Sequence, residues 1–297
     1  MTKPKIKTKA PVKIKRKYHR HKQLQICSSM DSMASVKAIR LGVFSGYHGP
    51  LTTKLGENTI TFDCSGQDQE HNDILDYMMS HCVESFLDTT GNLYLGAVLT
   101  DYFRWKKIKP DVGTFKKKVK ELQKLRIEVK NIQCDVSSPV VGLSGYLNRS
   151  AENGTDVQIK KLRRGEVFFI QIMPLFLKFL DLDVTLKYPD LIPNILGIKS
   201  DTVKSCVRYF LTQTYKEGWL VKSSNKTGYC STRVLCSRLY PDHMLVSKDK
   251  RNRRERDLRD HAGILKDSFG IIFDAVADTW TYTRHPQLRY KMSIGPE

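Results

Sequence analysis

Hydroxyl and cationic side chains cluster in the segment after residue 199. Five of them fall within nine residues: Ser200, Thr202, Lys204, Ser205 and Arg208. Ser200 is a good N-cap, so a helix is predicted from residue 201 to about residue 215. Such side chains bind phosphates and base edges in the major groove. Arg208 is expected to contact guanine with two hydrogen bonds, which discriminates between bases by about 1 to 3 kcal/mol, so Arg208→Ala should relax sequence preference.

A second predicted helix, from residue 112 to about residue 125, is basic on one side. At about 100° per residue, Phe115, Val119 and Leu122 share one face. The opposite face carries Lys117, Lys120 and Lys124. One face is therefore expected to pack, and the other to contact phosphates or bases in an adjacent groove. The alternative for this stretch is a solvated lysine face on an ordinary helix.

Strand patterns follow both basic helices. Residues 126–130 and 140–147 are predicted to form one hairpin, and residues 219–222 and 229–237 another. The cations of the second hairpin, expected to touch the DNA backbone, are Lys222, Lys226 and Arg233. A shorter helix is predicted before each basic helix, at residues 95–103 and 190–196. Helix, turn, basic helix and hairpin in this order are typical of a winged helix-turn-helix domain, whose second helix enters the major groove.

The expected fold class is α+β, with two tandem winged helix-turn-helix domains. The predicted divisions are a disordered basic N-terminal arm at 1–35, a first winged-helix domain at 36–157, a second at 158–241 and a C-terminal helical extension at 242–297. The chain has 297 residues, of which 40% are hydrophobic, and this is enough for two domains to bury a core.

The net charge of +19 is unevenly distributed. Residues 1–22 contain ten Lys or Arg and no acid, without a helical period, so this arm is expected either to attract polyanions or to act as a solubilising tail. Residues 248–260 contain seven Lys or Arg but also four acids, which suits a solvated helix more than a DNA-binding arm. The apolar residues after it, from Ile264 to Trp280, are expected to dock on the second domain or on a partner, and self-association through them is a hypothesis.

Several function classes lack support in the sequence. It has no G-x-x-x-x-G-K-[ST], G-x-S-x-G or H-E-x-x-H motif, and the Arg, His and Tyr residues of 284–290 are too crowded for a DNA strand-transfer enzyme. Its seven cysteines form no C-x-x-C pair. We therefore expect no enzymatic activity, no cofactor and no metal. Without an apolar stretch of about 20 residues or a signal peptide, the expected location is the cytoplasm, with the nucleoid or a plasmid.

Three segments resemble the iteron-binding plasmid and plasmid-prophage replication initiators of the RepA class. They are residues 39–44 (Ile-Arg-Leu-Gly-Val-Phe), 93–130 and 191–241. The resemblance spans about residues 36–241, and the basic arm and the tail after Pro241 have no counterpart in it. It implies two winged-helix domains related by a pseudo-twofold axis, with the principal recognition helix at 200–214 and the other DNA-facing helix at 114–125.

The resemblance also implies a function. Monomers would bind direct repeats at a replication origin and open it for host replication proteins, and homodimers would repress the initiator's own promoter. The alternative is a winged-helix transcriptional regulator without an origin role, which a single inverted repeat beside the gene would favour. A third class is an architectural or segregation protein that coats DNA without sequence preference.

Overall fold

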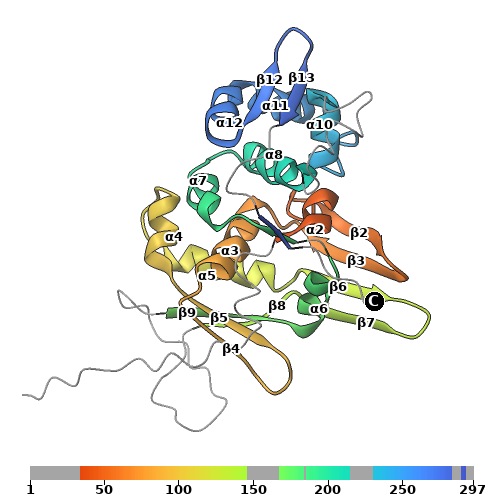
Figure 1. Cartoon of the computed structure of the whole chain (residues 1–297), viewed down its shortest axis with the longest axis vertical. Coiled ribbons are helices and arrows are strands. Elements are labelled where there is room, and N and C mark those ends of the chain that lie inside the picture. Colours follow the sequence, from red (N-terminus) through yellow and green to blue (C-terminus); the bar gives the residue numbers. More distant parts are fainter. Residues whose placement is uncertain (1–33, 146–166, 184, 215–229, 283–288, 292–297) are drawn as a thin grey trace, which may run out of the picture.

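The computed structural model describes residues 34–145, 167–183, 185–214, 230–282 and 289–291. In Figure 1, helices and a small hairpin lie at one end of the molecule, further helices lie in the middle, and the two four-stranded sheets lie beside the middle and toward the other end. The mixed α+β class is confirmed. None of the helices in the described ranges combines the length and the apolar composition that crossing a bilayer requires.

One four-stranded sheet is antiparallel, in the order β2-β3-β6-β7. Its strands are β2 (His48–Leu55), β3 (Asn58–Ser65), β6 (Arg126–Lys130) and β7 (Asp135–Pro139). Alternate side chains of a strand point to opposite faces, so Ile60, Phe62 and Ile127 are buried while Asp63 and Arg126 are exposed. The partner strand predicted for residues 126–130 is wrong, because β6 pairs with β7 and not with residues 140–147.

The other four-stranded sheet has the order β4-β5-β9-β8. Its strands are β4 (Glu84–Leu87), β5 (Leu93–Val98), β9 (Val167–Ile172) and β8 (Val141–Gly145). Gly96 has no side chain because the ring of Phe169, opposite it on β9, would lie 2.5 Å from a Cβ. β9 pairs with β5 along its whole length, so the boundary predicted between residues 157 and 158 would divide this sheet.

Five of the described helices belong to this half of the chain. They are α2 (Val36–Leu41), α3 (Gln69–Ser80), α4 (Leu99–Trp105), α5 (Val112–Leu122) and α6 (Pro174–Leu182). The Asp68 side chain caps α3 by accepting hydrogen bonds from the backbone N–H groups of Glu70 and His71. Nearly every side chain of α3 is buried, so this helix lies in the interior with neighbours on all sides.

The remaining elements surround α8 (Asp201–Leu211). They are β10 (Thr185–Lys187), the 3₁₀ turns η1 (Pro189–Leu191) and η2 (Thr212–Thr214), α7 (Ile192–Leu196), β11 (Cys230–Ser231), α10 (Thr232–Leu239), α11 (Lys248–Asp260), α12 (Ala262–Phe269), β12 (Ile271–Asp274), β13 (Thr279–Tyr282) and β14 (Arg289–Lys291). β11, β13 and β12 form a small antiparallel sheet in that order. β14 and β1 (Ala34–Ser35) flank β10, so the last two residues of the predicted disordered arm form a paired strand.

The strand predicted at residues 229–237 is wrong, because most of it forms helix α10. Ser231 caps this helix by accepting a hydrogen bond from the backbone N–H of Val234. The residues that α10 buries, spaced three and four apart, are Thr232, Leu235, Cys236 and Leu239. The strand predicted at residues 219–222 lies outside the described residues.

The predicted C-terminal extension packs onto the rest of the chain. Leu258, Leu265, Phe269 and Trp280 are buried, and they belong to the same connected cluster of apolar side chains as α8 and the two large sheets. Docking of the tail on the second predicted domain is therefore confirmed. The whole described chain shares one core.

Candidate nucleic-acid interface

Helix α5 separates a packed face from a cationic face. Phe115 is buried and meets the rings of Tyr102 and Phe168 edge-on, at centroid distances of 5.1 Å and 5.3 Å. The residues exposed on the opposite side are Lys117, Lys120 and Lys124. None of these three side chains makes an ion pair or a hydrogen bond among the described residues. The predicted orientation of α5 is confirmed, and among the described residues nothing occupies the side chains of Lys117, Lys120 and Lys124.

The lysine between them has a different role. Lys118 is half-buried and pairs with Asp68 at 2.9 Å, Glu121 at 3.6 Å and Glu70 at 3.7 Å. Burial would lower the pKa of Lys118, but the hydrogen bond from its ammonium to Asp68 and the neighbouring acids outweigh this and raise the pKa. Lys118 therefore anchors α5 to the N-terminus of α3 and is not available to a ligand.

The surroundings of α5 are also basic. The segment from α4 to the end of β7, residues 99–139, contains eleven Lys or Arg and five Asp or Glu, a net charge of +6. Lys107 and Lys109, in the turn between α4 and α5, are exposed. The face of α5 thus lies in a positive field that favours a polyanion.

The β6–β7 hairpin that follows α5 has a tip closed by side-chain hydrogen bonds. The Asn131 side chain closes the turn by accepting hydrogen bonds from the backbone N–H groups of Gln133 and Cys134, each at 2.8 Å. Its amide also donates to Asn58 of the neighbouring hairpin, at 2.8 Å. Ile132 between them is fully exposed. This turn explains why the partner strand begins at residue 135 and not at residue 140.

The prediction that Arg208 contacts DNA is wrong, because its guanidinium is only 1% exposed. The group donates to Asp76 at 2.9 and 2.8 Å, to Asp73 at 2.8 Å and to Gln69 at 2.6 Å, all on α3. Burial would lower the pKa of Arg208, but Asp76 and Asp73 outweigh it and hold the pKa above its usual value. Arg208 is an internal cation.

The neighbours of Arg208 on α8 are internal as well. Lys204 is buried and donates to Asp73, and burial lowers its pKa. Thr202 and Ser205 are also buried, and the Thr202 hydroxyl accepts a hydrogen bond from Tyr240 at 3.0 Å. Ser200 caps α8, as predicted, and its hydroxyl is hydrogen-bonded to Asp257 of α11. The helix at 200–214 is thus not a DNA-facing helix, because other helices cover it.

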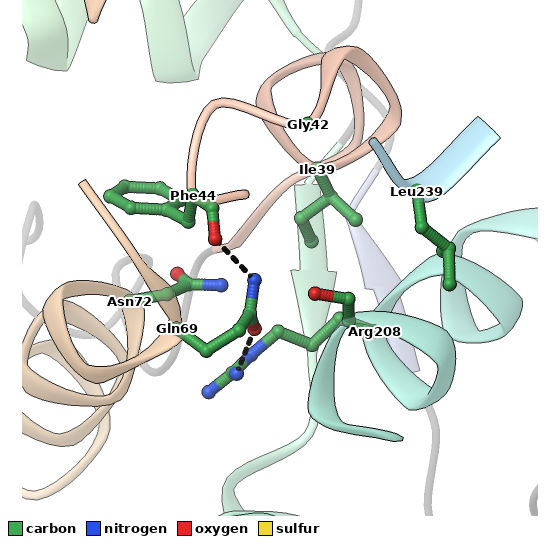
Figure 2. A pocket seen from close by; sticks show the side chains of 8 residues that line it. Ile39, Gly42, Phe44, Gln69, Asn72, Arg208 and Leu239 are labelled. Atoms are coloured by element: carbon green, nitrogen blue, oxygen red, sulfur yellow. Dashed lines mark hydrogen bonds between the residues drawn. The ribbon is translucent and has the colours of Figure 1, made fainter. Parts of the chain in front are cut away.

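A small cavity beside Arg208 offers no ligand site. Figure 2 shows Gln69 between the Phe44 carbonyl and the Arg208 guanidinium, with Ile39 and Leu239 closing the other side. The cavity volume of about 10 Å³ accommodates at most one water molecule. Among the described residues, no group of three or more His, Cys, Asp or Glu side chains is placed to hold a metal ion.

Helix α11 uses some of its cations in contacts with the rest of the protein. Arg254 pairs with Asp242 at 2.9 Å and lies 3.7 Å from the ring centroid of Tyr240. Arg251 donates to two carbonyls of the turn between α10 and α11, and Arg259 pairs with Asp278 at 3.2 Å. Three exposed cations make no such contacts with the described residues: Lys248, Arg253 and Arg256. The prediction of a solvated helix at 248–260 holds for this outer face.

The elements around α11 repeat those around α5. The basic helix α11 is preceded by a shorter helix, α10, and followed by the β12–β13 hairpin. The short helix α12 lies between α11 and this hairpin. α8 packs against α10, α11 and α12 (Figure 1). Arg233, predicted on a hairpin, lies exposed on α10, while Lys222 and Lys226 lie outside the described residues. The seven cations of α11 are visible in the sequence, but its four acids favoured the interpretation as a solvated helix.

Comparison with known proteins identifies no family. No family model and no curated protein matches the sequence. A crystal structure of selenomethionine derivatives of domains 2 and 3 of RctB is similar, with a TM-score of 0.45 and 12% sequence identity. The alignment covers 75% of this chain and 80% of that chain. A TM-score this low does not establish a common fold.

Proposed function

We propose that the chain is a non-enzymatic, double-stranded DNA-binding protein that contacts the duplex through α5 and the β6–β7 hairpin. The observation that carries the proposal is the exposed row of Lys117, Lys120 and Lys124, which has no ion-pair partner in the described part of the chain and lies opposite a packed aromatic face. Unpaired lysines in a positive field bind phosphates and release counterions. A helix with a packed back, a preceding helix and a following hairpin suits insertion into the major groove.

A second DNA-contacting surface is proposed on α11. It replaces the surface predicted on α8, whose cations are neutralised internally by α3. Lys248, Arg253 and Arg256 are the proposed contacts, and the β12–β13 hairpin takes the place of the second wing. Each half of the chain would then contribute one winged helix-turn-helix unit.

The biological role proposed is replication initiation at a plasmid or phage-type origin, with repression of the protein's own promoter. The resemblance of residues 36–241 to RepA-class initiators supports it, and host replication proteins and a homodimer would be the partners. A transcriptional regulator without an origin role is the second candidate. Footprinting on DNA beside the gene distinguishes them, since protected direct repeats favour the initiator and one inverted repeat the regulator.

Binding itself is tested by removing the α5 cations. Lys117→Ala, Lys120→Ala and Lys124→Ala together should weaken binding to all duplexes. Each phosphate contact contributes about −0.9 to the slope of log affinity against log salt, so three contribute about −2.7. The ratio of wild-type affinity to triple-variant affinity should therefore shrink by about 40-fold between about 50 and 200 mM salt. Fluorescence anisotropy with a labelled duplex measures both quantities, and the corresponding α11 triple tests the second surface.

The control removes the same charge elsewhere. Lys54 on β2, Lys178 on α6 and Lys266 on α12 are exposed and lie on other elements. Their triple alanine variant should leave the salt slope unchanged. Equal loss of affinity in the two triples would show that net charge alone attracts DNA, and would refute a specific α5 surface.

A further inference from the structure

Helices α3 and α8 meet through a buried set of charged and polar side chains, here named the α3–α8 joint. Its members are Gln69, Asp73 and Asp76 on α3 and Lys204 and Arg208 on α8. Their exposed fractions do not exceed 7%. Two cations of α8 face two carboxylates of α3, and Lys106, after α4, also lies 3.7 Å from Asp73. Tyr188 adds a hydrogen bond to Asp76 at 3.1 Å.

Each side of the joint is attached to one proposed DNA-binding surface. On one side α5 packs against α3 and is anchored there by Lys118, and Lys106, after α4, pairs with Glu70 at 2.9 Å. On the other side α8 packs against α11, and Ser200 is hydrogen-bonded to Asp257. The chain of contacts therefore runs from α5 through α3 and α8 to α11.

The chemistry of the joint demands one geometry. Apolar side chains tolerate small shifts between helices, since their attraction has no preferred direction and a displaced methyl group packs against the next neighbour. A guanidinium is a planar fork whose hydrogen bonds to carboxylates are directional. A shift that broke them would leave charges buried without partners, which is strongly unfavourable. Buried ion pairs therefore contribute little net stability to the fold, but they can fix the position of one helix relative to another.

We propose that the α3–α8 joint sets the distance and orientation between the α5 and α11 surfaces, and thereby the spacing of the two DNA segments that the protein binds together. The proposal rests on the proposed function. Asp73, Asp76, Lys204 and Arg208 are positioning residues that touch no DNA. Binding through two surfaces held at a fixed separation raises the affinity for a duplex long enough to reach both.

The first measurement needs no DNA. Thr100 on α4 and Asn252 on α11 are exposed, and each is replaced by a ketone-bearing amino acid that takes a spin label. Pulsed electron resonance on the full chain then gives the distance between the two halves. In the neutral joint variant Asp73→Asn, Asp76→Asn, Lys204→Met, Arg208→Met, we expect the single narrow distance to broaden or shift. A distribution as narrow as that of the wild type, at the same distance, would overturn the proposal.

A control separates positioning from general destabilisation. Val207 is fully buried on α8 but is not part of the joint. Val207→Ala should weaken the fold and leave the distance unchanged. If the fourfold variant does not fold, the pair Asp76→Asn, Arg208→Met, which removes one charge of each sign, replaces it. Broadening of the same size in Val207→Ala would also refute a specific role for the joint.

The second measurement uses random-sequence duplexes of about 10 to 40 base pairs, one to four helical turns. Wild-type affinity should rise at the length that reaches both surfaces. The joint variant should bind the shortest duplex with wild-type affinity, and its affinity for the longest duplex should be about tenfold or more below that of the wild type. Equal affinities on long duplexes would overturn the role in spacing. Failure of the wild type to bind any duplex would instead refute the proposed function, while the distance measurement still decides whether the joint fixes the two halves.

Discussion

Arg208→Ala is expected to destabilise the protein rather than to relax its base preference. The guanidinium donates four hydrogen bonds inside the protein, three of them to buried carboxylates. Truncation leaves Asp73 and Asp76 buried with Lys204 as the nearest remaining cation. Removing one partner of a buried ion pair costs about 3 to 5 kcal/mol. Since 1 kcal/mol shifts Tm by about 2 to 4 °C in chains of this size, a fall of about 10 °C is expected.

Urea denaturation followed by far-UV circular dichroism measures the loss. Arg233, exposed on α10, provides the matched control, and Arg233→Ala should change stability by less than about 0.5 kcal/mol. The same two variants are compared in a selection for preferred duplex sequences. If Arg208→Ala kept its stability within about 1 kcal/mol and altered base preference, its internal role would be refuted and a direct contact with DNA supported.

Two further predictions concern Asp68 and Ser200, the side chains that cap helices α3 and α8. Burial would raise the pKa of Asp68, but hydrogen bonds from His71 and Lys118 outweigh it and hold the pKa below its usual value. The stability that this shift contributes is present above the unfolded pKa of about 3.9 and is lost as pH falls through the pKa of the folded protein. Asp68→Asn should therefore be less stable than the wild type at neutral pH, and its stability should fall less on acidification. An unchanged acid titration of unfolding would contradict this. Ser200→Ala should cost about 1 kcal/mol in urea titrations through loss of the α8 cap, whereas a changed salt slope of DNA binding would show that Ser200 contacts phosphate after all.

Local sequence rules predicted the elements whose environment is decided within a few residues. The 3.6-residue period identified the packed face of α5, and Ser200 was identified as the cap of α8. These features depend on side-chain spacing and backbone capping, which the sequence states directly.

Longer-range choices were missed where two interpretations competed. Residues 229–237 contain β-branched residues that suggested a strand, although Ser231 and the spacing of Leu235, Cys236 and Leu239 already fit a capped helix. The contact with α8 favours the helix, because only that conformation places these three side chains on one side. Pairing of β6 with β7, and of β5 with β9, likewise depends on partners that no local pattern specifies.

The sequence by itself determined which helices are amphipathic and where their charges lie. Only the tertiary structure decided what covers each polar face. Lys204 and Arg208 recur four residues apart on α8, and Gln69, Asp73 and Asp76 recur at helical spacing on α3, so each row alone suggests a solvent-facing surface. In the fold the two rows neutralise each other. Periodicity identifies a polar face but not its partner, because opposite charges can replace water only when distant segments meet.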